Sequence, residues 1–426
     1  TVRREGSPAQ PDFPTPIDQY FQSLSVPMHS SNDACDSTMQ LGNNMTSTTS
    51  LMKRTGLSGI LLLICPLLLH ASDVEEIFDA SGVQGGLVVH LGCGRGEFSS
   101  QLAGERFLVH GLDGNPDNVT ASREALDEAG VADRAWIDHL SGNRLPYADG
   151  VVNFLIDENT RRRVSGEEIA RVLTPGGVVM RRLPSGAQFS TLPLQELPSG
   201  LADWTMFVKP RSDALDEWTH HLHDASCNAV AEDSVVGPPT RMQWIEEPVW
   251  SNHHKTVANV DAMVSSNGRL FYICEESPPS ISPVAMPDQW NLVARDAFNG
   301  ILLWRIPIED WGWKAWSGMA MARNNQPTHI GRRLVSVGDR VYVTLGYNAP
   351  VTELDAATGE VLRVFEGTES TDAILCQNER LILSINKEPQ SPDPDTVEFL
   401  RPAVRKSVAV IDIPSGRMLW KTGDYE

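Results

Sequence analysis

A loop of alternating glycines lies between two apolar segments of the chain. The apolar run Leu87–Leu91 leads directly into Gly92-Cys93-Gly94-Arg95-Gly96, and a second run, Phe107–Leu112, ends at Asp113. Glycine lets a backbone approach a ligand closely, and the N-terminus of a helix after such a loop favours polar or anionic groups. An acid at the end of the second strand can accept hydrogen bonds from ribose hydroxyls. The pattern predicts the front half of a nucleotide-binding βαβ unit; tight packing of a strand on a helix is the alternative.

The elements that would position this loop continue along the chain as alternating helices and strands. A helix is expected from Asn115 to Gly130 and a second from Ser165 to Leu173, with strands at 135–137, 151–156 and 178–183. Strands that alternate with helices predict a Rossmann-like α/β fold, a doubly wound parallel sheet that binds its ligand at the carboxyl ends of the strands.

Four segments in this order resemble the class I S-adenosylmethionine-dependent methyltransferases over residues 80–185. They are VVHLGCGRGE (88–97), GLDGNPDNV (111–119), LPYADGVVNFLI (145–156) and EEIARVLTPGGVV (167–179). The resemblance implies S-adenosylmethionine as the cofactor. It implies that the loop glycines line the methionine moiety and that the acid after the second strand holds the ribose. The implied cofactor-binding residues are His90, Gly92, Cys93, Gly94, Gly96 and Asp113; no catalytic residue is assigned.

The sequence departs from that family at three positions where an acid is usual. His90 precedes the first glycine by two residues, Ser141 precedes the Leu-Pro turn, and Asn153 lies in the fourth strand. We expect each change to remove a carboxylate that contacts the cofactor, and the three together to weaken binding by about a few kcal/mol, because charge-assisted hydrogen bonds are roughly twice as strong as neutral ones. His90 is either a catalytic base or a buried histidine bonded to backbone.

After Gly200 the composition changes, and a β-rich repeat begins. Each copy has a strand, a hairpin, a strand that ends in Asp, a turn closed by Gly, and a strand with a terminal Trp; the acids are Asp296, Asp355 and Asp412. The repeat resembles the PQQ-type β-propeller of quinoprotein alcohol dehydrogenases. The repeat indicates the fold and not a cofactor, so PQQ is only a secondary cofactor candidate beside S-adenosylmethionine. Three copies do not close a ring. We therefore expect a truncated propeller, with Met242-Gln243-Trp244 closing a blade that is completed elsewhere.

A histidine-rich segment, 218–224, joins the two halves. Its histidines are His220, His221 and His223, and His253-His254 follow downstream. Imidazole clusters suit Zn or Cu, but the spacing matches no metal motif, so a polar junction loop is preferred and no metal site is expected. The segment also resembles the corresponding part of large propeller proteins from planctomycete-type bacteria. The widely spaced cysteines predict neither a zinc ribbon nor a disulfide framework.

The N-terminal part carries a pattern typical of export. Met52-Lys53-Arg54 precedes an apolar run at 57–69 and small residues after it, which is the order of a secretory signal peptide. A buried core helix is the alternative. The run is too short to span a bilayer. Residues 1–51 would then be a disordered leader or a gene-model artefact. We expect the protein in the periplasm or cell envelope if the signal at 52–72 is used, and in the cytoplasm otherwise.

The expected organisation is therefore a leader (1–51), a signal peptide (52–72), a methyltransferase-like domain (73–200), a linker with the lead-in to the repeats (201–260) and an incomplete propeller (261–426). A formal net charge of -20 argues against a general nucleic-acid binder. Three functions remain open: a methyltransferase with an unknown acceptor, a quinoprotein-type dehydrogenase, and an exported scaffold with a vestigial methyltransferase domain. The expected partners are a small-molecule cofactor and a protein or polymer bound by the propeller.

Overall fold

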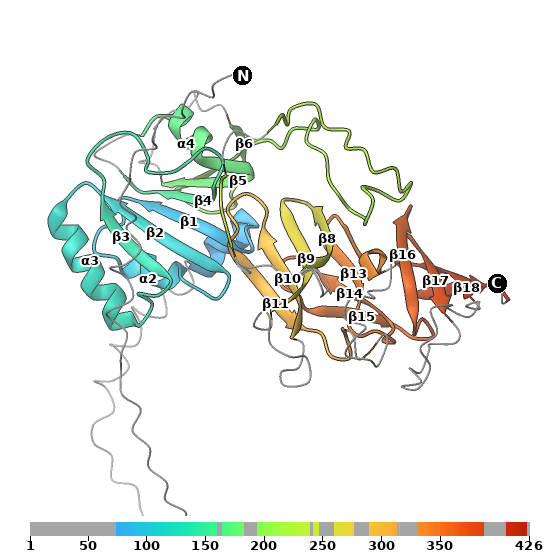
Figure 1. The fold of residues 1–426 in the computed structure, drawn as a ribbon. Helices are drawn as coiled ribbons and strands as arrows, with labels where there is room; N and C mark the ends of the chain where they lie inside the picture. Colours follow the sequence, from blue (N-terminus) through green and yellow to red (C-terminus); the bar gives the residue numbers. More distant parts are fainter. Residues whose placement is uncertain are drawn as a thin grey trace, which may run out of the picture. The chain divides into compact units, whose positions relative to one another are not determined.

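The computed structural model describes residues 74–159, 164–182, 194–238, 242–246, 260–276, 289–312, 315, 330–386 and 406–423 (Figure 1). The chain divides into two units, residues 1–57 and 58–426, and every described residue belongs to the second. The leader, the signal peptide and His253-His254 lie outside the described residues.

A mixed seven-stranded sheet, called the α/β sheet below, occupies the first part of the described chain. Its strand order is β3-β2-β1-β4-β5-β7-β6. β1 to β5 pair in parallel, whereas β7 is antiparallel to both of its neighbours. The strands are β1 Gly86–Leu91, β2 Phe107–Asp113, β3 Ala135–His139, β4 Val152–Asp157, β5 Leu173–Arg182, β6 Gln195–Leu197 and β7 Trp204–Val208. The Rossmann-like prediction is confirmed, and the sheet runs eight residues past Gly200 to Val208.

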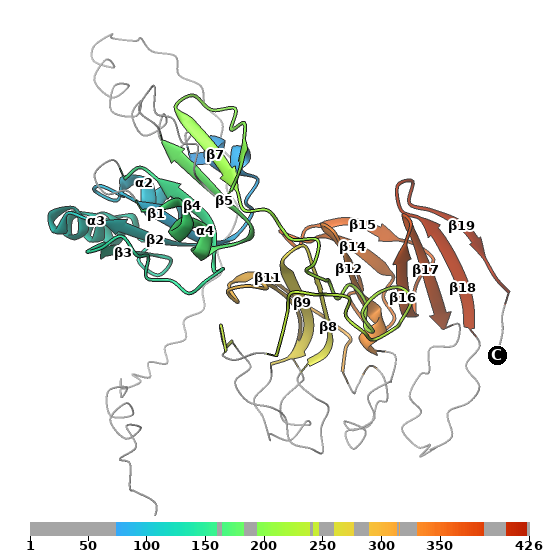
Figure 2. The same ribbon diagram turned by 90° about the horizontal axis from the view of Figure 1, so that it is seen from above.

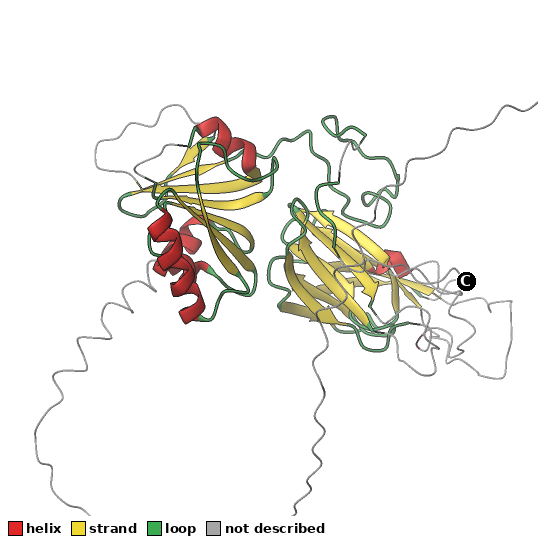
Figure 3. Ribbon diagram, turned by 60° about the vertical axis from the view of Figure 1, so that its left-hand side comes forward, coloured by secondary structure: helices red, strands yellow, loops and turns green. Residues whose placement is uncertain are grey.

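Helices cover both faces of the α/β sheet (Figure 3). The helical residues 74–81, α2 (Glu97–Leu102) and α3 (Pro116–Ala129) contribute apolar side chains to one core, which includes Val88 and Phe154. α4 (Gly166–Val172) packs on the opposite face. α3 begins where the Asn115 side chain accepts the Asp117 N–H and ends at Gly130, whose φ is +70°, so both predicted ends are confirmed by ordinary cap chemistry.

Three antiparallel four-stranded sheets follow among the described residues, coloured yellow, orange and red in Figure 2. We call them sheets I, II and III. Sheet I contains β8 Val260–Ser266, β9 Arg269–Glu275, β10 Trp290–Asp296 and β11 Leu302–Pro307. Sheet II contains β12 Leu334–Val337, β13 Arg340–Thr344, β14 Val351–Asp355 and β15 Val361–Phe365, preceded by a short 3₁₀ helix, Ile330–Arg333. Sheet III contains β16 Thr371–Gln377, β17 Arg380–Asn386, β18 Lys406–Asp412 and β19 Arg417–Lys421.

The third strand of every such sheet ends in the predicted acid, and an Asp–Gly turn (296–300, 355–359 and 412–416) connects it to the fourth. In sheet II the carboxylate of Asp355 accepts the N–H groups of Ala357 and Thr358. Gly359 closes the turn with φ +75°, a value that disfavours any residue with a Cβ. The repeat read from the sequence is thus a structural unit, and its acid holds a turn.

The side chain eight residues after each acid decides how one sheet packs on the next. The indole N–H of Trp304 in sheet I donates to the Ala356 carbonyl of sheet II at 3.0 Å, and its ring covers Gly359. Sheet II departs from the predicted repeat here, because Arg363 stands in place of Trp. Its guanidinium donates to the Ile413 carbonyl of sheet III at 2.6 Å. Trp244 packs on the turn of sheet I in the same way, through the Ala297 carbonyl.

The segment at 218–220 binds the first strands of all three sheets. The Ser265 N–H of β8 donates to the Trp218 carbonyl, and the Ser336 N–H of β12 donates to the Thr219 carbonyl. The Cys376 N–H of β16 donates to Nε2 of His220 at 3.0 Å. Three successive residues therefore satisfy one backbone donor on an edge strand of each sheet, which helps to hold the sheets together.

We expect Trp304→Ala to lower the free energy of unfolding by about 3–5 kcal/mol, because it removes a buried aromatic and its inter-sheet hydrogen bond. Trp420 occupies the same register in sheet III but is half exposed, so Trp420→Ala should change stability by less than about 1 kcal/mol. Urea unfolding of both variants measures the difference. Equal losses would contradict the docking role of Trp304.

Candidate functional site

The carboxyl ends of β1, β2, β4 and β5 lie at one edge of the α/β sheet and bring together the predicted cofactor residues. β1 ends before Gly92, β2 ends at Asp113, and β4 ends just before Glu158. Parallel strands place these ends side by side. A site built here combines backbone N–H groups with carboxylates.

The glycine loop adopts a backbone that side chains would obstruct. Gly92, Gly94 and Gly96 have φ values of +77°, +58° and +84°. A Cβ on Gly92 would lie 2.9 Å from the backbone of Asn159, and one on Gly96 would lie 2.8 Å from Cβ of Ser122. A Cβ on Gly94 would meet nothing within 4 Å. The outer two glycines therefore serve close packing, whereas the central one borders open space.

Asp113 links the glycine loop to the end of β2. Its Oδ2 accepts the Gly94 N–H at 3.0 Å, and its Oδ1 accepts the Asn115 N–H at 2.8 Å and the Asn118 amide at 3.2 Å. A carboxylate has about four acceptor positions. These three bonds therefore leave Asp113 with capacity for a further donor, although the residue is only 7% exposed.

His90 is buried and bonded through both ring nitrogens. Nδ1 lies 2.8 Å from the Ser99 hydroxyl, and Nε2 lies 3.0 Å from a carboxylate oxygen of Glu158. A carboxylate only accepts, so the Nε2–H donates to Glu158, while Nδ1 and the Ser99 hydroxyl share the second bond. Of the two predicted roles, the structure favours a bonded buried histidine, although its partners are side chains and not backbone.

Glu158 is a site residue that the sequence reasoning missed. Arg182 of β5 donates to its second oxygen at 2.8 Å. Burial would raise the pKa of the Glu158 carboxyl, but the bonds and charges of His90 and Arg182 outweigh it and lower the pKa. Beside it, Asp157 forms a buried ion pair with Arg181 at 2.6 Å. The sequence did contain a signal for this site, because two acids, Asp157 and Glu158, directly follow the apolar run at 151–156.

Cys93, the other predicted cofactor residue, lies within the loop but is buried. Burial raises the pKa of its thiol to about 12, with the Asp113 charge as the second cause. The thiol therefore stays protonated at neutral pH and packs in the core between the sheet and α3. Nucleophilic chemistry needs a thiolate, so Cys93 contributes packing and its backbone.

Comparisons with known proteins find similarity over this part of the chain. A family model described as a methyltransferase domain matches residues 88–177. Over these residues the α/β sheet is similar to methyltransferase domains. Its strand order and glycine loop agree with the resemblance noted from the sequence. No curated protein matches the chain at a significant level.

Several solved structures are similar to this region. One, from Methanococcus maripaludis, is assigned as an S-adenosylmethionine-dependent methyltransferase and is 15% identical to this chain. The match covers 35% of this chain and 89% of that chain, with a TM-score of 0.30. One from Aquifex aeolicus is 21% identical, with 33% and 79% covered and a TM-score of 0.26. A geranyl diphosphate methyltransferase in complex with S-adenosylmethionine is 20% identical, with 30% and 55% covered and a TM-score of 0.25. This chain thus spans about half of the last protein.

The expected role of Asn153 near the cofactor is wrong. Asn153 is the second residue of β4, so it lies at the amino edge of the α/β sheet, at the other end of the strand from Glu158. Its side-chain oxygen accepts the Leu87 N–H at 2.8 Å. Ser141 is exposed in the loop after β3. The departure at Asn153 therefore says nothing about cofactor affinity.

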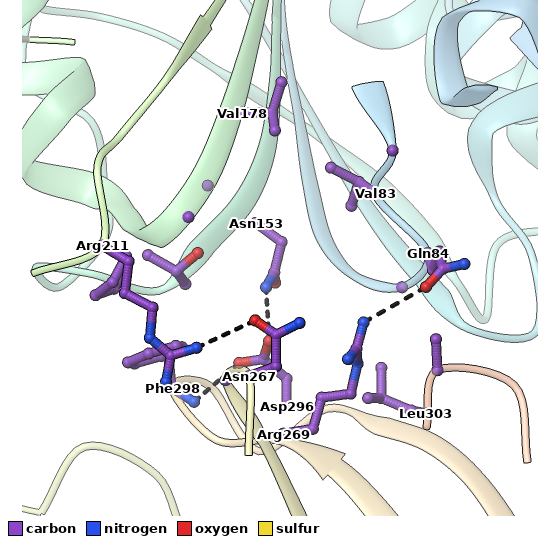
Figure 4. Close-up of a pocket in the computed structure, with 18 of the residues that line it drawn as sticks. Val83, Gln84, Asn153, Val178, Arg211, Asn267, Arg269, Asp296, Phe298 and Leu303 are labelled. Carbon is purple, nitrogen blue, oxygen red and sulfur yellow. Dashed lines mark hydrogen bonds between the residues drawn. The ribbon is translucent and has the colours of Figure 1, made fainter. Parts of the chain in front are cut away.

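A cavity of about 310 Å³ borders the amino edge of the α/β sheet and sheet I (Figure 4). Its charged groups are already paired: Arg211 with Glu217 at 2.6 Å, and Arg269 with Asp339 at 2.8 Å. Asp296 accepts from Asn153 at 2.6 Å. The cavity lies away from the glycine loop and is a weaker candidate for the cofactor.

The histidine-rich segment is bound into the fold. Nε2 of His223 lies 2.7 Å from Asp216, and His220 accepts the Cys376 N–H. Within the described ranges, no group of three or more His, Cys, Asp or Glu side chains is arranged to hold a metal. No helix in this described part is long and apolar enough to cross a membrane.

His220 should make the protein less stable in mild acid. Burial lowers the pKa of its imidazole from 6.5 to about 4, so the unfolded chain binds the extra proton between these values. The stabilisation is therefore complete above pH 6.5 and falls as the pH drops towards 4.

We expect about 2 kcal/mol to be lost from this group between pH 7 and pH 5. His220→Gln keeps an acceptor near Nε2 but does not titrate, so its stability should fall less over the same range. Thermal unfolding at the two pH values measures this. Parallel curves for wild type and variant would be inconsistent with a buried neutral His220.

Proposed function

We propose that the methyltransferase domain binds S-adenosylmethionine at the carboxyl edge of its sheet and transfers the methyl group to an acceptor not yet identified. The observation that carries the proposal is Gly94, which has a left-handed φ of +58° and open space where a Cβ would stand. The Asp113 carboxylate accepts its N–H. A loop that exposes backbone beside a carboxylate suits a nucleoside with a polar tail.

Each end of the cofactor would have chemically suitable partners. Asp113 retains acceptor capacity for ribose hydroxyls, and Gly92, Gly94 and Gly96 would let the backbone approach the methionine moiety. The acid that the resemblance expects at His90 is absent, but the Glu158 carboxylate lies 3.0 Å from that imidazole. We propose that Glu158 supplies the missing negative charge near the ammonium group.

Methyl transfer needs little covalent chemistry from the protein. S-adenosylmethionine supplies a methyl group on a sulfonium; an acceptor lone pair forms the new bond to carbon while the carbon–sulfur bond breaks, and the electrons stay on sulfur. The contribution of this domain would be to hold the two reactants in line and close together. No described residue is assigned as a base for the acceptor.

For the second half of the chain, we propose that sheets I to III are consecutive blades of a β-propeller. Support comes from the regular docking of Trp304 and Arg363 on the turn of the next sheet, and from Trp244 on the turn of sheet I. None of the comparisons supports PQQ as a cofactor.

An exported binding scaffold with a vestigial methyltransferase domain is the second candidate. One observation favours it: both oxygens of Glu158 are already engaged, by His90 and by Arg182. A carboxylate neutralised within the protein attracts a cationic ligand less strongly. Export remains a proposal based on the signal-peptide pattern at 52–72.

Isothermal titration calorimetry with S-adenosylmethionine and S-adenosylhomocysteine tests the binding site. Asp113→Asn should weaken binding at least about tenfold, because charge-assisted hydrogen bonds contribute roughly 1.5–3 kcal/mol. The matched control is Asp117→Asn, which changes an acid in the first turn of α3 and should bind as the wild type does. No heat with either ligand at millimolar concentration would favour the scaffold.

A further inference from the structure

The Asp–Gly turn of sheet I differs from its two counterparts in the bonds made by the third residue after the acid. The third residue after the acid is Thr358 in sheet II and Ser415 in sheet III, and each hydroxyl donates to the acid of its own turn. In sheet I the residue is Asn299. Its amide donates instead to the Val151 carbonyl at 2.9 Å and to the Asn153 oxygen at 2.7 Å. This turn is therefore directed towards β4 of the methyltransferase domain.

The acid of the same turn also reaches β4. Oδ1 of Asp296 accepts the N–H groups of Phe298 and Asn299, as Asp355 does with the matching residues in the turn of sheet II. Its second oxygen accepts from the Asn153 amide at 2.6 Å, and Figure 4 shows the two side chains pointing towards each other. Asp296 is only 6% exposed. Burial raises the pKa of its carboxyl, against the hydrogen bonds that lower it, foremost the one from Asn153.

The neighbouring bonds fix the orientation of the Asn153 amide. Its oxygen accepts from both Leu87 N–H and Asn299, at 2.8 Å and 2.7 Å. The NH₂ group must therefore face Asp296. An aspartate at position 153 would place a second carboxylate against a buried one, and two carboxylates in one buried site cannot both stay ionised without a large penalty.

Apolar contacts surround this polar group. Ile301, directly before β11, packs against the apolar cluster that α4 forms with the α/β sheet. Leu303 lies so close to Gly85 that a Cβ there would be 2.7 Å from its methyl group. Gly85 immediately precedes β1, so the contact continues along the amino edge.

We infer that Asn153 binds the amino edge of the methyltransferase domain to the Asp–Gly turn of sheet I. The acid that the resemblance leads one to expect at position 153 is absent because Asp296 requires a donor there. The junction couples the two regions, so they unfold together. The change at this position serves assembly of the chain and is independent of cofactor binding.

A charge exchange across the pair tests this inference. Asn153→Asp keeps the acceptor for Leu87 N–H but sets two carboxylates against each other, so the unfolding midpoint should fall more at pH 8 than at pH 5, where the pair can share a proton. The double variant Asn153→Asp with Asp296→Asn restores one donor and one acceptor. It should recover most of the loss at pH 8. Asn115→Asp is the matched control, because aspartate is equally suited to a helix N-cap.

Limited proteolysis of residues 209–238, between β7 and β8, gives a second readout. Faster cleavage of Asn153→Asp, but not of the double variant, is expected. Asn299→Ala removes two junction bonds without adding charge and should also speed cleavage if Asn153→Asp fails to fold. An Asn153→Asp protein that matches wild type at pH 8, or a double variant no better than the single one, would overturn the inference.

Discussion

The loop that connects β1 to α2 follows a backbone path that has no room for side chains at its outer two glycines. Gly92 passes against Asn159, Gly96 passes against Ser122, and all three loop glycines take left-handed φ values. Replacing the outer two would bring a Cβ within 3 Å of neighbouring atoms. The position of Asp113, the burial of Cys93 and the open space at Gly94 all depend on this path. The candidate cofactor site is thus a consequence of close packing as well as of ligand chemistry.

A second constraint, the Asp–Gly turn, organises the β-rich half. The same acid-capped turn accepts a side chain from the preceding element in all three sheets: Trp244, Trp304 and Arg363 in order. The acceptor is always the backbone carbonyl next to the acid, so the side chain can change from indole to guanidinium while the docking geometry persists. In sheet I this turn also meets β4, which gives one short motif two structural uses.

Local patterns predicted the α/β class, both ends of α3, the repeat and its acids, because caps, turns and strand periods depend on nearby residues. Contacts between residues far apart in the sequence cannot be predicted from such local patterns. His220 meets Cys376 across 156 positions, and Asn153 meets Asp296 across 143. The position of Asn153 at the start of its strand did contain the clue that it lies far from the carboxyl edge. Glu158 was missed although it follows the predicted strand directly.

The central claim is that the edge formed by Gly92–Gly96 and Asp113 holds S-adenosylmethionine. Hydrogen–deuterium exchange on the full chain, with and without S-adenosylhomocysteine, tests it most directly. The account predicts slower amide exchange at 92–97 and 113–118 and unchanged exchange in sheets I to III. Unchanged exchange in the glycine loop at saturating ligand, or protection confined to the β-rich half, would contradict it.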